Sequence, residues 1–401
     1  MEEPPPLPPQ RPKSLGNSWF HHAATASACA PVFAFGTVLA ANLSRLGQID
    51  IRPFAGAVLA VGILAGIVSL FGIGRYGKKP IVERATLGIL GAALLAGFSW
   101  GGQNWLLNQA RTNVVKGRVD SFKTARAIHV TRLTRKVRNG EAPPEPPADI
   151  FKLVKYETEL GLMDAYLGVD PGDGRKHPAI IWKFGGFSNS IDENAWVPGS
   201  PDNDQSASPF REAGIVMMYP SVRGGNLNPG YVECGFGEVD DLIAAARYLK
   251  QLPYVNPDRV YLGGHSVGGT FVLLTAAAAP TEFRAVFSLG PVANTANYPK
   301  EYLTFDLKNE MDEAVRAPIR WLHEIKSPTF VFEGGIDGND WDVLKMARNN
   351  RGAAEFFVLQ ESDHFNLIRP LTSFLARKIL NDTDGKMTIT PGEVRTGMVV
   401  F

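Results

Sequence analysis

Ser266 stands in a short glycine-rich segment whose residue types suit a nucleophile. Residues 264–268 read Gly-His-Ser-Val-Gly, between an apolar strand pattern at 259–263 and an apolar helix pattern at 270–279. A serine attacks a carbonyl when a tight strand-to-helix turn lifts its hydroxyl clear of the backbone, and small residues on both sides permit that turn. The glycine spacing of this segment does not match that of a dinucleotide-binding motif, and the segment lacks the lysine of a P-loop. We therefore interpret Ser266 as a nucleophile.

His364 is the best candidate for the base. A histidine that serves a serine on such a turn follows it in the chain, and of the seven histidines only His323 and His364 lie clearly downstream. His323 falls in a helical pattern, where a structural histidine is expected. His364 follows a strand pattern at 355–359 and a short polar loop, so it can lie over the carboxyl edge of a sheet.

Asp337 is the expected acid of a catalytic triad. It follows a strand pattern at 328–333 and two glycines, where a carboxylate can accept a hydrogen bond from the imidazole and fix its tautomer. Asp340 and Asp342 are close enough in sequence to compete. Asp363 is a weaker alternative because it adjoins the histidine in sequence.

Several motifs occur in an order that resembles the prolyl oligopeptidase family of serine hydrolases. They lie within residues 152–380, somewhat over half of the chain. The motifs are Phe184-Gly185-Gly186-Phe187, Arg223-Gly224-Gly225, the run from Gly237 to Leu242, the run from Leu252 to Arg259, and residues 264–269. The resemblance implies an α/β-hydrolase fold and a triad of Ser266, Asp337 and His364.

Phe184 departs from that family pattern. The family commonly has a tyrosine at this place, whose hydroxyl donates to the oxyanion, and often a tyrosine in place of Val267. Phenylalanine cannot donate a hydrogen bond. We therefore expect the backbone N–H of Val267, with that of Gly186 or Phe187, to form the oxyanion hole. Nothing in the sequence could encode the β-propeller that many family peptidases carry.

Strand and helix patterns alternate downstream of residue 150, which predicts a doubly wound, mostly parallel α/β sheet. We expect strands near 152–157, 162–167, 179–184, 215–219, 260–263, 285–289, 328–332 and 356–359, and helices at 238–252, 267–279, 341–349 and 367–380. The long connection at 291–326 is a candidate lid or substrate wall.

The first third of the chain holds three uncharged stretches, at 23–43, 54–74 and 85–107. Each approaches or exceeds the roughly 20 residues that span a bilayer. We therefore expect a Pro-rich tail at 1–22, a transmembrane region at 23–107, a basic stalk and linker at 108–150, a catalytic domain at 151–382 and a C-terminal tail at 383–401. The basic loop at 75–84 favours a multi-pass protein with a non-cytoplasmic catalytic domain, and makes the lipid bilayer a partner.

Other kinds of site find little support in the composition. The chain is nearly neutral, with 41 basic and 40 acidic residues, so the nine basic residues of 111–138 indicate lipid head groups and no nucleic acid. Cys29 and Cys234 lie in different predicted regions and are not expected to pair. No metal-binding spacing occurs, and no cofactor is expected.

These observations predict a membrane-anchored serine hydrolase that cleaves a small ester or a peptide through an acyl-enzyme. A carboxylesterase using the same triad, a catalytically silent binding module and a membrane sensor are the alternatives. We expect an apolar pocket near the serine. Its candidate residues are Phe184, Phe187, Tyr298, Tyr302, Phe305 and Trp321.

Overall fold

The computed structural model describes residues 22–23, 25–27, 29, 63–64, 67, 86, 89–90, 104–118 and 121–398. The chain divides into two compact units, Met1–Gln109 and Ala110–Phe401. The second unit contains every residue predicted to take part in catalysis.

The membrane prediction has to be corrected. No helix within the described part of the chain is long and apolar enough to cross a bilayer. Most of the three predicted spans lies outside the described residues. The assignments as a multi-pass protein, with a bilayer partner and a non-cytoplasmic catalytic domain, therefore have no structural support.

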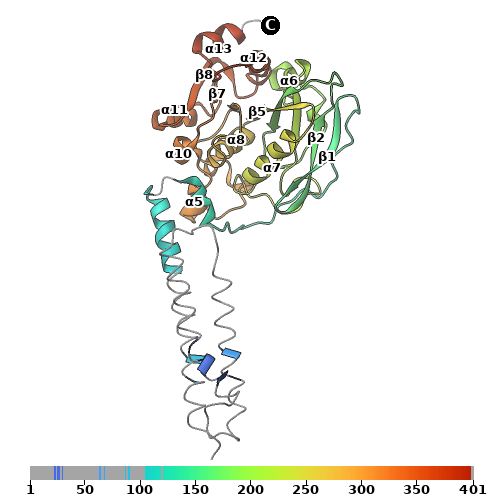
Figure 1. Cartoon of the computed structure of the whole chain (residues 1–401). Coiled ribbons are helices and arrows are strands. Elements are labelled where there is room, and N and C mark those ends of the chain that lie inside the picture. The colour runs from blue at the N-terminus through green and yellow to red at the C-terminus, as the bar shows by residue number, and fades with distance from the viewer. Residues whose placement is uncertain are drawn as a thin grey trace, which may run out of the picture. The chain divides into compact units, whose positions relative to one another are not determined.

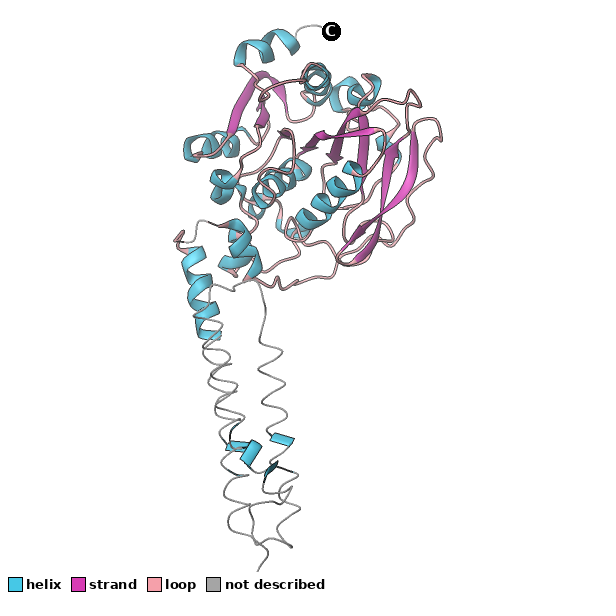
Figure 2. Cartoon of the chain, viewed as in Figure 1, coloured by secondary structure: helices cyan, strands magenta, loops and turns pink. Residues whose placement is uncertain are grey.

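The second unit is built on an eight-stranded sheet. Figure 2 shows its strands in magenta. Its spatial order is β1-β2-β4-β3-β5-β6-β7-β8. Strands β3 to β8 run parallel, whereas β1 pairs antiparallel with β2, and β2 with β4. The strands are β1 (Phe151–Thr158), β2 (Gly161–Gly168), β3 (His177–Lys183), β4 (Val216–Pro220), β5 (Val255–His265), β6 (Val286–Leu289), β7 (Thr329–Ile336) and β8 (Ala354–Asp363). All eight predicted strands are confirmed, and with them the mostly parallel α/β sheet.

Helices cover both faces of this sheet, which explains why its central strands are almost wholly apolar (Figure 1). One core contains residues of α5 (Phe122–Ala127), α7 (Glu238–Lys250), α8 (Val267–Ala278), α10 (Pro318–Trp321) and α11 (Asp340–Asn349). The core on the other face contains residues of α6 (Ser208–Glu212), α12 (Ile368–Leu380) and α13 (Pro391–Met398). A further short helix is α9 (Glu310–Ala314), and short 3-10 helices include η2 (Glu193–Ala195), η3 (Pro201–Asn203), η4 (Thr295–Asn297), η5 (Lys300–Tyr302) and η6 (Leu322–Glu324).

Two segments predicted to be linker and tail contact the rest of the second unit. In the expected linker, the Thr134 amide donates to Thr304 O (2.7 Å) and the Val232 amide donates to Val137 O (2.9 Å). In the expected tail, Glu393 of α13 accepts a bond from Lys378 of α12 (2.8 Å). Both segments are therefore part of the folded unit.

The turn from β5 into α8 requires glycines because it packs against other strand ends. A Cβ added to Gly268 would lie 2.1 Å from Lys183 O and 2.6 Å from Phe184 O, and one on Gly269 would lie 2.4 Å from Leu289 O. These neighbours are backbone atoms of the carboxyl ends of β3 and β6, which cannot move independently of the sheet. The glycines thus let the turn lie directly against its neighbouring strands.

We expect Gly268→Ala to destabilise the catalytic unit by several kcal/mol, because the added methyl group overlaps backbone oxygens. Thermal unfolding of the purified variant measures this loss. Gly392→Ala is the matched control, because its Cβ would meet only the Thr390 hydroxyl at 3.9 Å. Equal melting temperatures for the two variants would contradict the packing argument.

Candidate active site

Ser266 occupies the strained position of a strand-to-helix turn. Its backbone has φ 55° and ψ −117°, in a region that residues with a side chain rarely adopt. The Ser266 amide donates to Leu289 O (2.7 Å), which fixes the turn to the end of β6. This is the geometry that presents a serine hydroxyl at the carboxyl edge of a parallel sheet.

His364 lies at the same edge, in the turn that follows β8. Its Nδ1 donates to Glu333 Oε2 (3.0 Å), and the Glu333 side chain is fully buried. The imidazole ring leaves no room for a side chain at Gly290, where a Cβ would lie 2.5 Å from His364 Cε1. Gly290 directly follows β6, so the histidine lies close to the strand end that anchors Ser266.

The Glu333 carboxylate is held by backbone donors as well as by the histidine. Oε1 accepts from the Gly334 amide (2.7 Å), and Oε2 accepts from the Asn339 amide (2.8 Å). Hydrogen bonds of this kind stabilise the ionised form of a buried carboxylate. The glutamate is therefore suited to orient the imidazole and to stabilise its protonated form.

The structure places the expected acids elsewhere. Asp337 is exposed, at φ 48°, and no hydrogen bond to its carboxylate occurs among the described residues. Asp340 begins α11, while Asp342 accepts from the Asn297 side chain (2.8 Å). Asp363 accepts from the amides of the two residues that follow His364. Glu333, which our sequence analysis treated only as the end of a strand, is the carboxylate at His364 Nδ1.

A tyrosine from the segment predicted to form a lid lies beside the turn that follows Ser266. The Tyr298 hydroxyl shares a hydrogen bond of 2.8 Å with the Thr270 hydroxyl, in the first turn of α8. Burial raises the pKa of Tyr298, so the phenol stays protonated. No hydrogen bond joins Ser266 Oγ to His364 in the described residues. Such bonds are often long in free enzymes and shorten when substrate binds.

Two of the expected oxyanion donors lie near the serine, because Val267 follows it in the chain and Gly186 lines the same cavity. Gly185 packs against Ser266, since its added Cβ would lie 3.2 Å from Ser266 Cβ, and Gly186 has φ 74°. No hydrogen bond to a protein acceptor involves the amides of Gly186, Phe187 or Val267 in the described part of the chain. Phe184 stacks on Tyr219, with ring centroids 5.0 Å apart.

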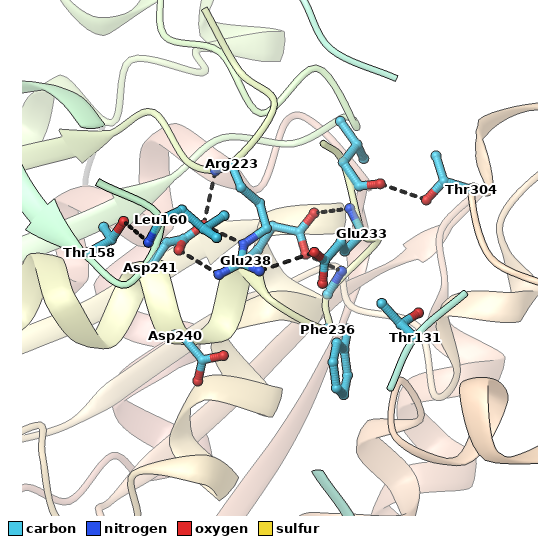
Figure 3. Close-up of polar contacts among 12 residues, drawn as sticks. Thr131, Thr158, Leu160, Arg223, Glu233, Phe236, Glu238, Asp240, Asp241 and Thr304 are labelled. Carbon is cyan, nitrogen blue, oxygen red and sulfur yellow. Dashed lines mark hydrogen bonds and ion pairs between the residues drawn. The ribbon is translucent and has the colours of Figure 1, made fainter. Parts of the chain in front are cut away.

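A buried ionic network holds the segment that carries these donors (Figure 3). The Arg223 guanidinium makes two 2.9 Å bonds to Asp241 and one 3.1 Å bond to Glu233. Glu238, fully buried, accepts from the Asn189 side chain (2.9 Å) and from the Glu233 amide (2.7 Å). Asn189 also donates to Arg223 O (3.0 Å), so the network fixes the chain just beyond Phe187.

A cavity of about 390 Å³ opens beside Ser266. Of the six aromatic residues predicted to line a pocket, Phe184 lines this one. Phe305 and Trp321 are buried, Phe305 against Arg316 (4.4 Å from ring centroid to guanidinium carbon). Phe187 contacts Tyr298, and Tyr302 is exposed. The cavity is therefore more polar than expected.

A sequence model of the prolyl oligopeptidase family matches residues 201–351. This match begins upstream of Arg223 and includes both Ser266 and Glu333. The predicted resemblance is confirmed.

Two curated relatives show how far the similarity extends. A probable chloroplastic glutamyl endopeptidase of Oryza sativa subsp. japonica is 25% identical over 216 residues, 48% of this chain and 22% of that protein. Prolyl oligopeptidase A of Galerina marginata is 34% identical over 110 residues, 26% of this chain and 14% of that protein. The matched part thus spans less than a quarter of either relative.

Among solved structures, dipeptidyl peptidase 4 of Porphyromonas gingivalis is similar at 17% sequence identity and a TM-score of 0.47. The similarity covers 58% of this chain and 35% of that one.

A buried lysine at the end of β3 permits a test of the electrostatics beneath the site. Lys183 is 2% exposed, and burial lowers its pKa from 10.5 to about 8, although Glu238 and Asp192 oppose the shift. Below pH 8 the ammonium is charged in both folded and unfolded states, so burial destabilises the fold. Above pH 10.5 it is neutral in both states, and this penalty is absent.

We therefore expect the free energy of unfolding of the wild type, relative to Lys183→Met, to rise with pH. The rise between pH 8 and 10.5 should be on the order of 3 kcal/mol. Urea unfolding of the wild type and of Lys183→Met at several pH values measures this rise. Other titrating groups are present in both proteins, so their contributions cancel when the two free energies are subtracted. A difference that does not vary with pH would contradict the predicted pKa.

Proposed function

We propose that this chain hydrolyses ester or peptide bonds through an acyl-enzyme on Ser266. His364 acts as the general base and Glu333 as the acid of the triad. The observation that carries the proposal is the hydrogen bond of the partly buried His364 to the fully buried Glu333, at the sheet edge where Ser266 occupies a strained turn. The resemblance to prolyl oligopeptidases supports the same chemistry.

The proposed cycle needs only these side chains and water. His364 Nε2 takes the proton of Ser266 Oγ as the oxygen attacks the substrate carbonyl. The histidine then gives this proton to the departing amine or alcohol, leaving the acyl group on the serine. A water molecule, deprotonated by the same nitrogen, attacks the acyl carbon and releases the acid. Glu333 stabilises the imidazolium during both acylation and deacylation.

Backbone N–H groups are the proposed oxyanion donors. We assign this role to Val267 with Gly186 or Phe187, because Phe184 has no hydroxyl to contribute. The amide of Val267 is the first of α8, and the first amides of a helix have no acceptor within it. The helix N-terminus also carries partial positive charge, which favours a developing oxyanion.

Tyr298 has a proposed place in the resting enzyme. Its hydroxyl bonds to Thr270, and Thr270 Oγ1 accepts from the Val292 amide (3.1 Å). The tyrosine thereby links the first turn of α8, which directly follows Ser266, to the lid segment.

Substitution of the two candidate acids tests the triad. We expect Glu333→Gln to lower kcat/KM by roughly 10³–10⁴, because the amide no longer stabilises the imidazolium or fixes its tautomer. Asp337→Asn should have little effect, because Asp337 is exposed and away from the histidine. Hydrolysis of a p-nitrophenyl ester measures both, with Ser266→Ala as the inactive reference.

Circular dichroism of each variant serves as the folding control for this comparison. A large loss in Asp337→Asn together with a small loss in Glu333→Gln would return the role of the acid to the aspartate. Unchanged turnover in Ser266→Ala would refute the acyl-enzyme itself.

A further inference from the structure

The cavity beside Ser266 has a polar wall and one ionisable carboxylate. Its apolar side chains are those of Phe184 and Phe365, whereas the loops at 188–194 and 203–205 contribute hydroxyl, amide and carboxylate groups. Pockets for small molecules are usually mostly apolar. Polar groups concentrated beside a nucleophile therefore indicate what part of a substrate lies there.

Asp192 supplies the carboxylate. Its Oδ1 accepts from the Asn194 amide (3.0 Å) and caps η2, while Oδ2 accepts no hydrogen bond among the described residues. The side chain is partly exposed within the cavity lining. One carboxylate oxygen thus remains available for a ligand.

No lysine or arginine belongs to the cavity lining in the described part of the chain. His265 does line it, but burial, reinforced by the charge of His364, lowers the pKa of His265 to about 3. This imidazole is therefore neutral near pH 7. The cavity carries the negative charge of Asp192 without a cation on its own surface.

Lys183 is the buried cation whose charge interacts with Asp192. Its stronger charge partner is Glu238, and its ammonium donates to Phe184 O (3.4 Å). Lys183 is not part of the lining, so it cannot bind a substrate anion in the cavity.

Gln205, another residue of the cavity wall, lies next to His265, which in turn contacts the backbone of His364. Gln205 donates to Asn203 Oδ1 (2.6 Å), and its Oε1 lies 3.3 Å from His265 Nδ1. His265 Nε2 donates to His364 O (2.8 Å). This part of the cavity wall therefore lies next to the turn that carries His364.

We propose that this cavity, here called the Asp192 cavity, selects substrates with a cationic group next to the scissile bond. The group is an ammonium or guanidinium on an alkyl stem, and the inference rests on the proposed hydrolase function. The charged end pairs with Asp192 and hydrogen-bonds to neighbouring polar groups. The stem contacts the rings of Phe184 and Phe365.

Quenched fluorescent peptides that differ only in one residue test this selectivity. Lysine, norleucine or glutamate is placed immediately before the scissile bond in one series and immediately after it in another. In the wild type we expect lysine to exceed norleucine in kcat/KM by roughly tenfold in one series, mainly through KM, and glutamate to be the poorest.

Asp192→Asn removes the charge but keeps an oxygen able to cap η2. The lysine-to-norleucine ratio should fall to about one, and Asp192→Lys should favour glutamate. Asp202→Asn is the matched control, since this neighbouring exposed aspartate is absent from the lining, and it should leave the ratio unchanged.

Labelling with a fluorophosphonate distinguishes failure of the proposed hydrolase function from failure of the proposed selectivity. A wild-type protein that is not labelled and cleaves nothing refutes the hydrolase function. A labelled protein that cleaves norleucine or glutamate peptides as well as lysine peptides, or none of them, overturns the selectivity. So does a lysine preference that survives Asp192→Asn.

Discussion

The catalytic unit depends on backbone-to-backbone packing where three parallel strands end. Gly268 and Gly269 lie so close to the ends of β3 and β6 that a methyl group would overlap their carbonyl oxygens. This contact forces the turn after β5 to be tight and gives Ser266 its positive φ. The same packing brings Ser266, the segment after β3 and the turn that carries His364 to one edge of the sheet, because parallel strands end together.

Buried charge keeps that edge rigid. The Arg223–Asp241 pair and the Glu238 carboxylate bind the chain around Asn189 on one side of the serine. On the other side Glu333 is saturated by two amides and the histidine. Removing one partner from such a pair is strongly destabilising, because it leaves a buried charge uncompensated. Both sets of bonds therefore fix positions on which a proton transfer would depend.

The strands, the strand-to-helix turn at Ser266 and the place of His364 after a strand could be predicted because each has a local pattern in sequence. The partner of the histidine could not. Asp337 follows two glycines, as an acid in a loop should, yet β7 continues to Ile336 and leaves the aspartate in solvent. Glu333 has a longer side chain and reaches His364 from within the strand. The sequence signal for Glu333 was its position as a charged residue at the end of an apolar run. A carboxylate buried at such a position needs hydrogen-bonding partners.

The identity of the nucleophile is the claim on which the account depends most. Mass spectrometry of the fluorophosphonate-labelled, proteolysed protein locates the modified residue directly, because the reagent reacts with an activated serine. The account predicts one adduct, on the peptide that contains Ser266, with labelling greatly reduced in His364→Ala. An adduct on another serine, or labelling of Ser266 that does not depend on His364, would contradict it.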